Sequence, residues 1–492
     1  MCLTILKKVM FVKRVKITAI GFGIAALLLV GRIFYISIIK QADYTESVMA
    51  QRVESVNFLS PRGIIYDRNM IKLTDAKMKL VVRDGVPYYV GNRTADLCSH
   101  IIGYISADGK GSGIEGAFDY VLSADESSRI SYIKDINNNR ISKGYNIDVV
   151  NSYKGVSLTI DYHIQEIVEN AMDFYSVNGA VVVADCKSGE VLAMASRPNY
   201  NAANLEKFLD GTEGELVNKA ICAYNPGSVF KIAVATAFLE NHYNDESYFE
   251  CNGKTVIDGT EFVCHKEDGH GLQTLEQAFA NSCNCAFYSL GKTIGIDDIC
   301  EYSTELGMGR EVLCINGIVE AKGMVPYVVY GDGDLANISI GQGNVMATPL
   351  QIADMLCTIC NGGVRNQLSL IRGIVDDEGI CAVTEGTTLG RVVSETTARR
   401  MTDMMNSAVE YGTGMSAQLD GCLAGGKTGS AETGWVKDGK TMQQGWFAGY
   451  FPAQNPQYVC VVLVENGISG SDSACPVFKK IGNDMVSGGY VN

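Results

Sequence analysis

Apolar residues gather most densely near the start of the chain, between Ile17 and Ile39. Only Arg32 and a few small or weakly polar residues interrupt this run of 23 residues. As a helix it would extend about 34 Å, at about 1.5 Å per residue, which is long enough to cross a bilayer. Because no small-x-small cleavage site follows it, the run predicts an uncleaved membrane anchor. A buried core helix and a cleaved signal peptide are the alternatives.

The charges beside this run predict its orientation. Five Lys or Arg residues lie between positions 7 and 16. Positive segments stay on the cytoplasmic side of a membrane. Residues 1–16 are therefore expected to form a cytoplasmic tail, residues 17–39 the transmembrane helix, and everything after Lys40 an extracellular body.

The segment after the anchor has the pattern of a small β-rich module. In residues 41–150 apolar and polar residues alternate in short runs such as Lys79–Arg83, and Asp84-Gly85 and Asp108-Gly109 are typical turn sequences. We therefore expect a short N-terminal domain here.

A second domain is predicted over residues 151–492. Its first part reads as a strand, a helix capped by Asp161 and a hairpin, over residues 156–160, 161–171 and 179–195. Residues 216–310 are mainly helical in period, and residues 423–465 return to strands. A sheet whose strands flank a long helical insertion belongs to the α+β class.

Charge excludes one class of partner. The 492-residue chain has a net charge of −14, but residues 1–40 hold seven basic residues and no acid. The remainder carries 34 basic and 55 acidic residues, a net charge of −21. A body this acidic is a poor partner for nucleic acid, so none is expected.

The first candidate for chemistry is the segment Ser228–Lys231, here called the first motif. It follows a Pro-Gly turn and opens an apolar helix, Phe230–Leu239. A hydroxyl at that place feels the positive end of the helix dipole, and Lys231 at i+3 can reach Ser228 Oγ. A neutral amine in a desolvated site can act as the general base. Taken alone, the pattern also fits a helix cap and a surface lysine.

Two further short segments follow in order. In Ser282–Asn284, the second motif, a hydroxyl can relay a proton and an amide can hold a carbonyl. In Lys427–Ser430, the third motif, just before the strands at 446–464, a lysine and hydroxyls can hold a carboxylate. Gly429 would let a substrate backbone approach closely. A polar helix end and an exposed β-turn are the structural alternatives for these two segments.

The combination of SxxK, SxN and KTG in this order resembles penicillin-binding proteins and serine β-lactamases. Flanking sequences are similar to class B penicillin-binding proteins in particular, and the resemblance covers nearly the whole chain after Lys40. These sequences are 62–69, 113–119, 224–228, 339–343, 347–351 and 425–430.

The resemblance implies a fold and a reaction. The fold is an antiparallel five-stranded sheet sandwiched by helices, with an all-helical lobe, a small N-terminal pedestal and one transmembrane helix. The reaction is D,D-transpeptidation, in which the serine is acylated by the penultimate D-Ala of a peptidoglycan stem peptide. An amine of a neighbouring stem then resolves the acyl-enzyme, and β-lactams acylate the same serine.

Carried onto this chain, the resemblance assigns a role to each motif residue. Ser228 is the nucleophile and Lys231 the base, while Ser282 and Asn284 relay protons and position the substrate. The third motif binds substrate through Lys427, Thr428, Gly429 and Ser430. The backbone N–H groups of Ser228 and Ser430 form the oxyanion hole.

The implied partners are stem peptides, β-lactams, the membrane and another enzyme. No glycosyltransferase domain is recognised before the pedestal, so glycan polymerisation is expected from a polytopic membrane glycosyltransferase. Catalysis needs no cofactor.

Three rival functions share this chemistry. A β-lactamase or β-lactam sensor is disfavoured, because no water-activating carboxylate is evident at 290–345, and Glu215 precedes the nucleophile. A D,D-carboxypeptidase would use water in place of the acceptor amine, and the pedestal favours transpeptidation over it. A non-enzymatic scaffold conflicts with three intact motifs.

A second kind of site is predicted from cysteine and histidine spacing. Cys251, Cys264, His270 and Cys283 form the pattern C-x12-C-x5-H-x12-C. Three thiolates and one imidazole are a typical ligand set for structural zinc. Cys285 could replace Cys283, although it is expected to face elsewhere. A Cys251–Cys264 disulfide and ordinary buried thiols are the alternatives, and some elongation-type relatives look similar, with a metal held near these positions.

Overall fold

The protein is described from a computed structural model with two compact units. The structure describes residues 2–44, 53–59, 62–74, 77–83, 86–92, 97–105, 111–123, 127–134, 140–148, 154–241, 247–376, 378–383, 386–437 and 440–491. Unit 1 comprises Met1–Ser60, Leu80–Val90 and Asp125–Asn151, and unit 2 comprises Pro61–Lys79, Gly91–Ala124 and Ser152–Asn492. The turns expected at Asp84-Gly85 and Asp108-Gly109 lie outside the described residues. The domain boundaries expected from the sequence stay a prediction.

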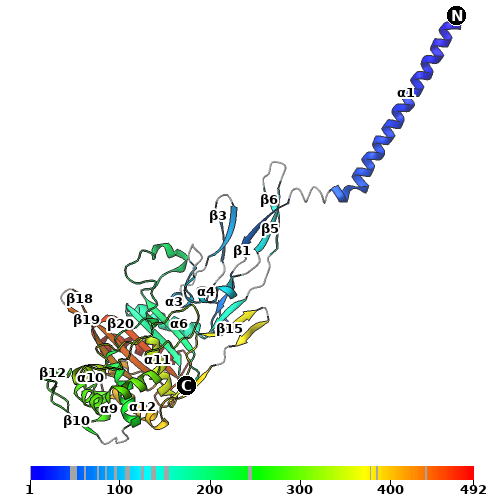
Figure 1. The fold of residues 1–492 in the computed structure, drawn as a ribbon. Coiled ribbons are helices and arrows are strands. Elements are labelled where there is room, and N and C mark those ends of the chain that lie inside the picture. Colours follow the sequence, from blue (N-terminus) through cyan, green and yellow to red (C-terminus); the bar gives the residue numbers. More distant parts are fainter. Residues whose placement is uncertain are drawn as a thin grey trace. The chain divides into compact units, whose positions relative to one another are not determined.

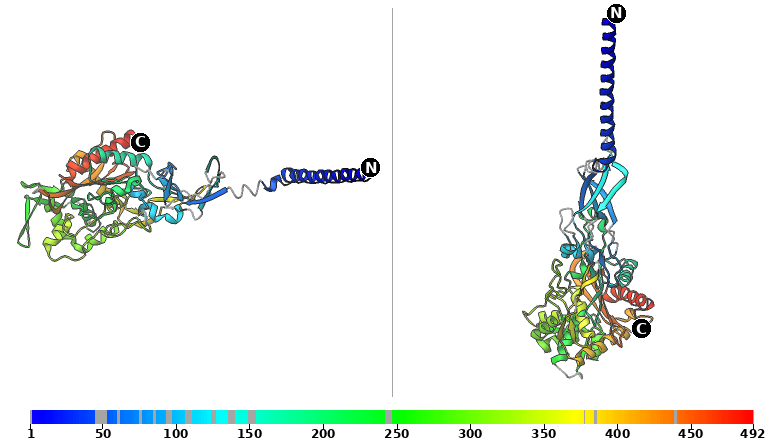
Figure 2. Two further views of the ribbon diagram at one scale, coloured as in Figure 1. Left: turned by 90° about the horizontal axis from the view of Figure 1, so that it is seen from above. Right: turned by 90° about the vertical axis from the view of Figure 1, so that its right-hand side faces the viewer.

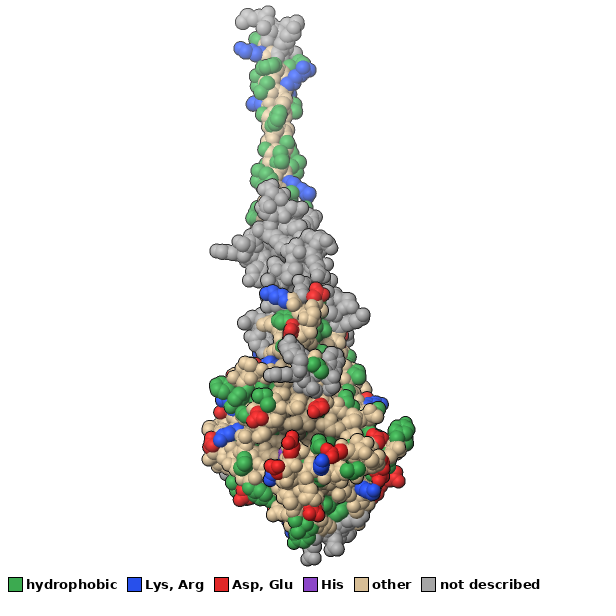
Figure 3. Space-filling model, turned by 90° about the vertical axis from the view of Figure 1, so that its left-hand side faces the viewer, with side chains coloured by type: hydrophobic (Ala, Val, Ile, Leu, Met, Phe, Trp, Pro, Cys, Tyr) green, Lys and Arg blue, Asp and Glu red, His purple; other side chains and the backbone are tan. Residues whose placement is uncertain are grey.

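Unit 1 begins with a long apolar helix. Helix α1 (Cys2–Phe34) continues into a π-helical turn, η1 (Tyr35–Ile39). Within the described residues, Lys8–Ile39 is the one segment long and apolar enough to cross a membrane. Its apolar side chains are exposed, with basic side chains toward the start of the helix (Figure 3). The segment expected to be the anchor is therefore helical throughout.

The strands that follow form antiparallel pairs. A three-stranded sheet has the order β1 (Val53–Leu59), β5 (Ser127–Lys134) and β6 (Arg140–Asp148). Strand β3 (Lys77–Arg83) pairs with β4 (Val86–Asn92), which confirms the strand predicted around Lys79–Arg83.

Unit 2 is built on a five-stranded antiparallel sheet (Figure 1). Its order is β18 (Gly425–Lys437), β19 (Lys440–Phe451), β20 (Tyr458–Gly467), β8 (Gly179–Asp185) and β9 (Val191–Arg197). Strands that lie far apart in the sequence thus pair side by side, β20 against β8. The predicted hairpin and the predicted return to strands are both confirmed.

Alternate residues of the sheet face two separate cores. Val181 and Val183 face the core that contains α6 (Tyr162–Phe174) and α13 (Cys475–Ser487). Those two helices lie side by side on one face of the sheet (Figure 2). Val182 faces the opposite core, where α7 (Lys231–Asn241), α11 (Pro349–Cys360) and α12 (Glu395–Glu410) pack. The predicted sheet sandwiched by helices is confirmed.

A second, smaller sheet joins early and late parts of unit 2. Its order is β16 (Gly379–Val383), β15 (Ile371–Asp376), β7 (Gly155–Leu158) and β2 (Ile65–Tyr66). Asp161 caps α6 as predicted, since its carboxylate accepts from the N–H groups of His163 and Ile164. Short helices α3 (Ser99–Ile102), α4 (Gly113–Ala117) and α5 (Asp119–Leu122) and the strand pair β14 (Val364–Asn366) and β17 (Thr388–Arg391) complete this region.

The insertion at residues 216–310 is less helical than the spacing of its apolar residues predicts. Helices α7, α8 (Leu275–Ala280) and α9 (Asn284–Glu305) are present, and α10 (Asp332–Ser339) follows. Between α7 and α8, however, lie four strands: β10 (Tyr248–Cys251), β11 (Lys254–Ile257), β12 (Thr260–Val263) and β13 (Gly271–Thr274). Each strand has four residues, which is too short for period-2 alternation to stand out.

Candidate active site

Ser228 lies in a tight turn rather than at the first residue of a helix. The 3₁₀ turn Gly227–Phe230 leads into α7, which begins at Lys231. The predicted apolar helix is therefore present, but it begins one turn after the serine. Gly227 has φ +53°, and a Cβ there would lie 2.5 Å from the Ser430 carbonyl oxygen. Only glycine lets the turn approach the third motif this closely.

Two neighbours fix this turn. Asn225 Nδ2 donates to the carbonyl oxygens of Gly343 and Val345, at 3.0 and 2.8 Å. The Trp446 indole N–H, fully buried in β19, donates to the Asn225 carbonyl at 3.0 Å. The segment just before Ser228 is thus held between the sheet and the loop that follows α10.

Lys231 is fully buried and bound to the second motif. Its Nζ donates to the Ser282 carbonyl at 2.8 Å, to Ser282 Oγ at 3.3 Å and to Asn284 Oδ1 at 2.8 Å. It also lies 5.1 Å from the centre of the Phe287 ring. Burial lowers the pKa of Lys231 to about 7, against the opposing effect of nearby thiols. A large fraction of this amine is therefore neutral at neutral pH.

The structure joins the first two motifs through Lys231 Nζ. Within the described residues, no hydrogen bond joins Lys231 Nζ to Ser228 Oγ. The contact between Lys231 and Ser228 Oγ that their i, i+3 spacing suggests therefore stays a prediction. A substrate-bound geometry can differ, because catalytic hydrogen bonds often tighten only in the complex.

The second motif forms the junction between two helices. Ser282 has φ +53° and lies between α8 and α9, and Asn284 is the first residue of α9. The left-handed backbone at Ser282 turns its carbonyl toward the buried lysine. Asn284 Nδ2 donates to the Val263 carbonyl at 3.5 Å, which links the motif to β12.

The third motif lies within a strand, not before one. Lys427 and Gly429 in β18 pair with Ala448 and Trp446 of β19. Lys427 is fully buried, and its Nζ donates to the Thr428 carbonyl at 3.0 Å. Burial, followed by the charge of Lys231, holds the pKa of Lys427 well below its usual value. The exposed β-turn considered from the sequence is therefore wrong.

Gly429 meets protein rather than open space. A Cβ at Gly429 would lie 2.8 Å from the Pro226 carbonyl oxygen and 2.9 Å from a Val229 methyl carbon. The glycine therefore brings β18 against the turn that carries Ser228. Ser430, by contrast, is exposed, and its Oγ accepts from the Gly470 N–H at 3.1 Å.

Sequence reasoning missed Thr413, a residue that touches the third motif. Thr413 Oγ1 lies 2.6 Å from Thr428 Oγ1, and the Thr413 N–H donates to the Ala280 carbonyl at 3.1 Å. The residue thus connects β18 with the end of α8, close to Ser282. Its only signal in the sequence is a threonine between two glycines, which belongs to none of the three motifs.

A partly buried ionic contact next to the nucleophile turn was also missed. The Tyr224 hydroxyl donates to Glu465 Oε1 at 2.8 Å, and Lys219 Nζ lies 2.6 Å from Glu465 Oε2. These residues are far apart in sequence, so no local pattern could reveal their contact.

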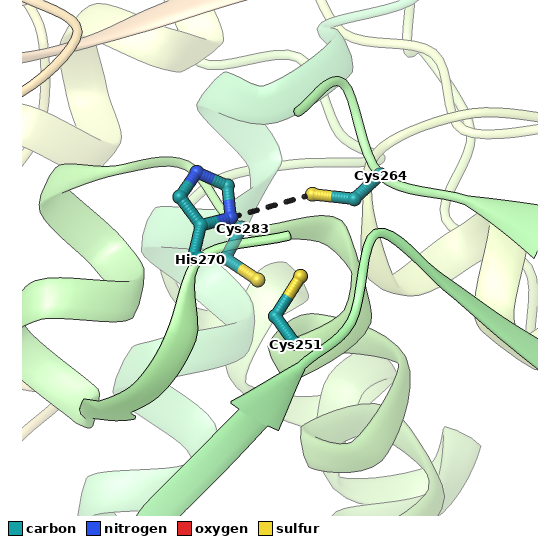
Figure 4. Close-up of side chains that lie close together, drawn as sticks. All are labelled: Cys251, Cys264, His270 and Cys283. Atoms are coloured by element: carbon teal, nitrogen blue, oxygen red, sulfur yellow. Dashed lines mark hydrogen bonds between the residues drawn. The ribbon is translucent and has the colours of Figure 1, made fainter. Parts of the chain in front are cut away.

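The predicted metal ligands converge in the helical lobe (Figure 4). One ligand atom from each of Cys251, Cys264, His270 and Cys283 lies within 4.8 Å of the others. The three thiols are buried, and Cys264 Sγ lies 3.6 Å from His270 Nδ1. Burial lowers the pKa of His270, which favours the neutral imidazole that binds metals. The donor set therefore fits a closed tetrahedral zinc site.

The structure corrects two sequence-based expectations about these cysteines. Cys251 and Cys264 are free thiols, not a disulfide. Cys285 does not face elsewhere, because it packs in the same buried cluster as Cys251, Cys264 and Cys283. Side chains in the first turn of a helix point back toward its N-terminus, so Cys285 reaches the same space as Cys283.

Comparisons with known proteins identify the family of this chain. The family model described as "Penicillin binding protein transpeptidase domain" matches residues 179–483. The chain is 29% identical over 446 residues to "Stage V sporulation protein D" of Bacillus subtilis, covering 85% of this chain and 66% of that protein. It is 29% identical over 390 residues to "Peptidoglycan D,D-transpeptidase PbpA" of Mycolicibacterium smegmatis, covering 75% and 77%.

A solved structure has the same fold. The D,D-transpeptidase domain of a peptidoglycan glycosyltransferase from Eggerthella lenta aligns with a TM-score of 0.72 and 26% identity. The alignment covers 88% of this chain and all of that one. Together with a family model that matches more than half of the sequence, this likeness establishes that the chain belongs to the penicillin-binding proteins, in the class B transpeptidase group predicted from its motifs.

Proposed function

We propose that this chain is a peptidoglycan D,D-transpeptidase that acts through an acyl-enzyme on Ser228. The observation that carries the proposal is the fully buried Lys231 amine, with a pKa of about 7, hydrogen-bonded to Ser282 and Asn284 beside the Ser228 turn. An amine that is largely neutral at neutral pH can accept a proton from a serine hydroxyl.

Acylation is the first half of the proposed reaction. Ser228 Oγ attacks the carbonyl carbon of the penultimate D-Ala, and its proton passes to Lys231 Nζ. The peptide C–N bond then breaks, and the last D-Ala leaves as an amine that takes a proton. Ser282 Oγ lies 3.3 Å from Lys231 Nζ and is proposed to relay that proton.

Deacylation is the second half of the proposed reaction, in which the acyl group passes from Ser228 to the acceptor amine. An amine of a neighbouring stem attacks the ester carbonyl and gives up a proton to Lys231. The Ser228 Oγ–C bond breaks, and the hydroxyl is regenerated as the new peptide bond forms. Asn284 keeps Lys231 in place through its Oδ1 and helps to position the substrate.

Substrate recognition falls to the third motif. The hydroxyls of Thr428 and Ser430 are proposed to donate to the terminal carboxylate, and Ser430 is the exposed member. Lys427 is buried with its Nζ on the Thr428 carbonyl, so it is proposed to act at a distance rather than by contact. A bound carboxylate would favour its charged form and so oppose the lowering of its pKa. The N–H groups of Ser228 and Ser430 are proposed to bind the oxyanion.

Covalent labelling tests the nucleophile. A fluorescent penicillin should label the wild-type chain on Ser228, located by mass spectrometry of a tryptic digest, and should not label Ser228→Ala. Lys231→Ala should slow labelling at least about 100-fold, because it removes the general base. Labelling of Ser228→Ala at the wild-type level would end the proposal.

Product analysis separates the rival reactions. With a D-Ala-D-Ala stem peptide and an excess of acceptor amine, a transpeptidase forms the cross-linked peptide. A carboxypeptidase forms the tetrapeptide instead, and sustained turnover of nitrocefin would indicate a β-lactamase.

We further propose that Cys251, Cys264, His270 and Cys283 hold a structural zinc ion. The ion would supply no reaction chemistry. Cys283 lies between Ser282 and Asn284, so its anchoring would fix the second motif against the loop that carries Cys264 and His270.

Metal content tests the zinc proposal. Elemental analysis should find about one zinc per chain after purification under reducing, zinc-replete conditions, in line with a closed four-ligand site. Cys264→Ser combined with His270→Ala should lose it, while Cys300→Ser, which alters a half-buried thiol in α9 outside the cluster, should keep it. Full zinc in the double variant, or substoichiometric zinc in the wild type, would contradict the proposal.

The remaining proposals concern the cellular localisation of the chain and its binding partners. The body after Lys40 is proposed to lie outside the cell membrane, with residues 1–16 inside. Peptidoglycan stem peptides and β-lactams would bind at Ser228, and a polytopic membrane glycosyltransferase would make the glycan strands.

A further inference from the structure

We infer that Tyr327 and Tyr330 form a platform that binds the sugar chain of the substrate. This inference rests on the proposed transpeptidase function, because it concerns the glycan strand to which the stem peptide is attached. The two residues precede α10 and are called the tyrosine platform below.

The two tyrosine rings are unusually exposed. Tyr330 is 94% exposed, the highest value for a large apolar or aromatic side chain in the described part of the chain, and Tyr327 is 77% exposed. Val328, between them, is 53% exposed. Three exposed apolar or aromatic side chains within four residues are costly in water, and such a concentration commonly marks a binding site.

The backbone beneath the platform is fixed. Val325 and Val329 pack against the main core, so the loop alternates between anchored valines and exposed tyrosines. At its start, the Met324 N–H donates to the Met346 carbonyl at 2.7 Å. An exposed ring on a fixed backbone loses little conformational entropy when it binds a ligand.

Polar contacts also tie the end of the loop to neighbouring elements. The Tyr330 N–H donates to Asp334 Oδ2 at 3.3 Å, and the Gly333 N–H donates to Asp258 Oδ2, in the turn between β11 and β12, at 3.2 Å. The exposure of the tyrosines is therefore a feature of an anchored loop, not of a detached one.

The platform is connected to the reaction centre by a short rigid element. Helix α10 begins directly after Gly331 and spans about 12 Å. Beyond its end, the Gly341 carbonyl accepts from the Gly227 N–H at 3.1 Å, next to Ser228. On the other side, β12 ends at Val263, whose carbonyl accepts from Asn284. The loop is thus tied to both the first and the second motif.

This separation fits the geometry of the substrate. About four stem residues lie between the sugar and the scissile bond, and an extended chain spans at most about 3.5 Å per residue, or about 14 Å. A stem peptide bound at Ser228 would place its sugar near the far end of α10. The platform precedes α10, so one length of this helix, about 12 Å, separates it from the loop that contacts the nucleophile turn.

The chemistry suits a sugar better than a charged partner. The axial C–H bonds of a hexosamine ring can pack on the electron-rich face of a tyrosine. Carboxylates of Asp258 and Asp334 lie at the same loop, and carboxylates accept hydrogen bonds from sugar hydroxyls. The net charge of −21 after residue 40 disfavours an anionic surface as the occupant.

The test compares substrates with and without sugar, using the full chain in detergent. The probes are uncross-linked glycan strands that carry stem pentapeptides, and the free pentapeptide. Tyr327→Ala combined with Tyr330→Ala should raise KM for the strands about tenfold, equivalent to about 1.4 kcal/mol, with kcat unchanged. KM for the free pentapeptide and the rate of penicillin acylation should stay at wild-type values.

Two control variants define the result. Tyr327→Phe combined with Tyr330→Phe keeps the rings and should retain the wild-type KM. Tyr120→Ala removes a ring that is 76% exposed elsewhere and should also retain it. An unchanged KM for the strands in the double alanine variant, an equal loss with the free pentapeptide, or a change in oligomeric mass by light scattering would overturn the inference. Failure of the wild-type chain to acylate would instead count against the transpeptidase proposal.

Discussion

Two buried lysines define the site at the scale of single residues. Lys231 and Lys427 are both fully buried, and burial lowers the pKa of each. Their mutual repulsion adds to the effect at Lys427. Only Lys231 contacts the second motif, whereas Lys427 Nζ binds the Thr428 carbonyl. We therefore propose different roles for them, proton exchange for Lys231 and electrostatic interaction with a bound anion for Lys427.

The pKa of Lys231 predicts how acylation depends on pH. Only the neutral amine can accept the Ser228 proton, and raising the pH increases its fraction. The acylation rate should therefore fall about tenfold per pH unit below about pH 7 and level off above it. Stopped-flow measurement of penicillin acylation between pH 5.5 and 9 would show this. A rate that is flat across the range, while circular dichroism shows the chain folded, would contradict the prediction.

Thr413 predicts a second effect at this scale. Thr413 Oγ1 lies 2.6 Å from Thr428 Oγ1. When the Thr413 hydroxyl is the donor, the hydroxyl proton of Thr428 remains available for a hydrogen bond to a substrate carboxylate. Thr413→Val should therefore reduce kcat/KM for acylation about tenfold, the value of a hydrogen bond to a charged group. Thr413→Ser keeps the hydroxyl and should stay within about threefold of wild type, which is under 1 kcal/mol. Equal activity of the valine and serine variants would show that the contact is dispensable.

At the scale of elements, the loop after α10 locks the nucleophile turn through one glycine. Gly341 has φ +74°, and a Cβ there would lie 2.0 Å from the Gly227 carbonyl oxygen. Gly343 in the same loop has φ +70°, but a Cβ there would meet only Asn337, at 3.9 Å. A side chain at Gly343 would therefore meet only backbone strain, whereas a side chain at Gly341 would meet both backbone strain and a steric collision.

The prediction is a large difference between two alanine variants. Gly343→Ala should cost only the left-handed strain, about 1–2 kcal/mol of unfolding free energy. Gly341→Ala adds a collision with the backbone beside Ser228, so it should also lose most penicillin acylation. Denaturant unfolding and acylation rates measured on both variants test this. Comparable acylation in the two would mean that the loop does not hold the turn.

Local sequence signals predicted the elements that are defined by near neighbours. Asp161 caps α6 through N–H groups two and three residues away, and the hairpin β8–β9 has a short turn. The convergence of Cys251, Cys264, His270 and Cys283 was also predictable, because these residue types and their spacing are distinctive. Strands β10–β13 were missed, since four residues show no clear alternation.

The rest of the site depends on contacts between distant segments. Lys231 meets Asn284 across 53 residues, and Tyr224 meets Glu465 across 241. The first contact could be anticipated only because the motifs resemble a known family. The second, like that between Thr413 and Thr428, belongs to no motif, so nothing in the sequence alone predicted it.

At the scale of the whole molecule, charge divides the chain into two parts. Seven basic residues and no acid lie in residues 1–40, and the remainder carries a net charge of −21. Acidic side chains are spread over the face of unit 2 seen in Figure 3. A basic segment attached to an apolar helix, followed by an acidic body, is the distribution expected when the start of the chain stays in the cytoplasm.

This distribution leads to a topology prediction. Protease added to intact spheroplasts should digest the body after Lys40 and leave a membrane-bound fragment that contains residues 1–39. Detection with an antibody against an epitope tag at the N-terminus would show that fragment protected, and permeabilised cells should lose it as well. An intact body in unpermeabilised spheroplasts would refute the orientation. Loss of the N-terminal tag from the mature membrane protein before any protease is added would instead identify the helix as a cleaved signal, because an uncleaved anchor keeps its cytoplasmic tail.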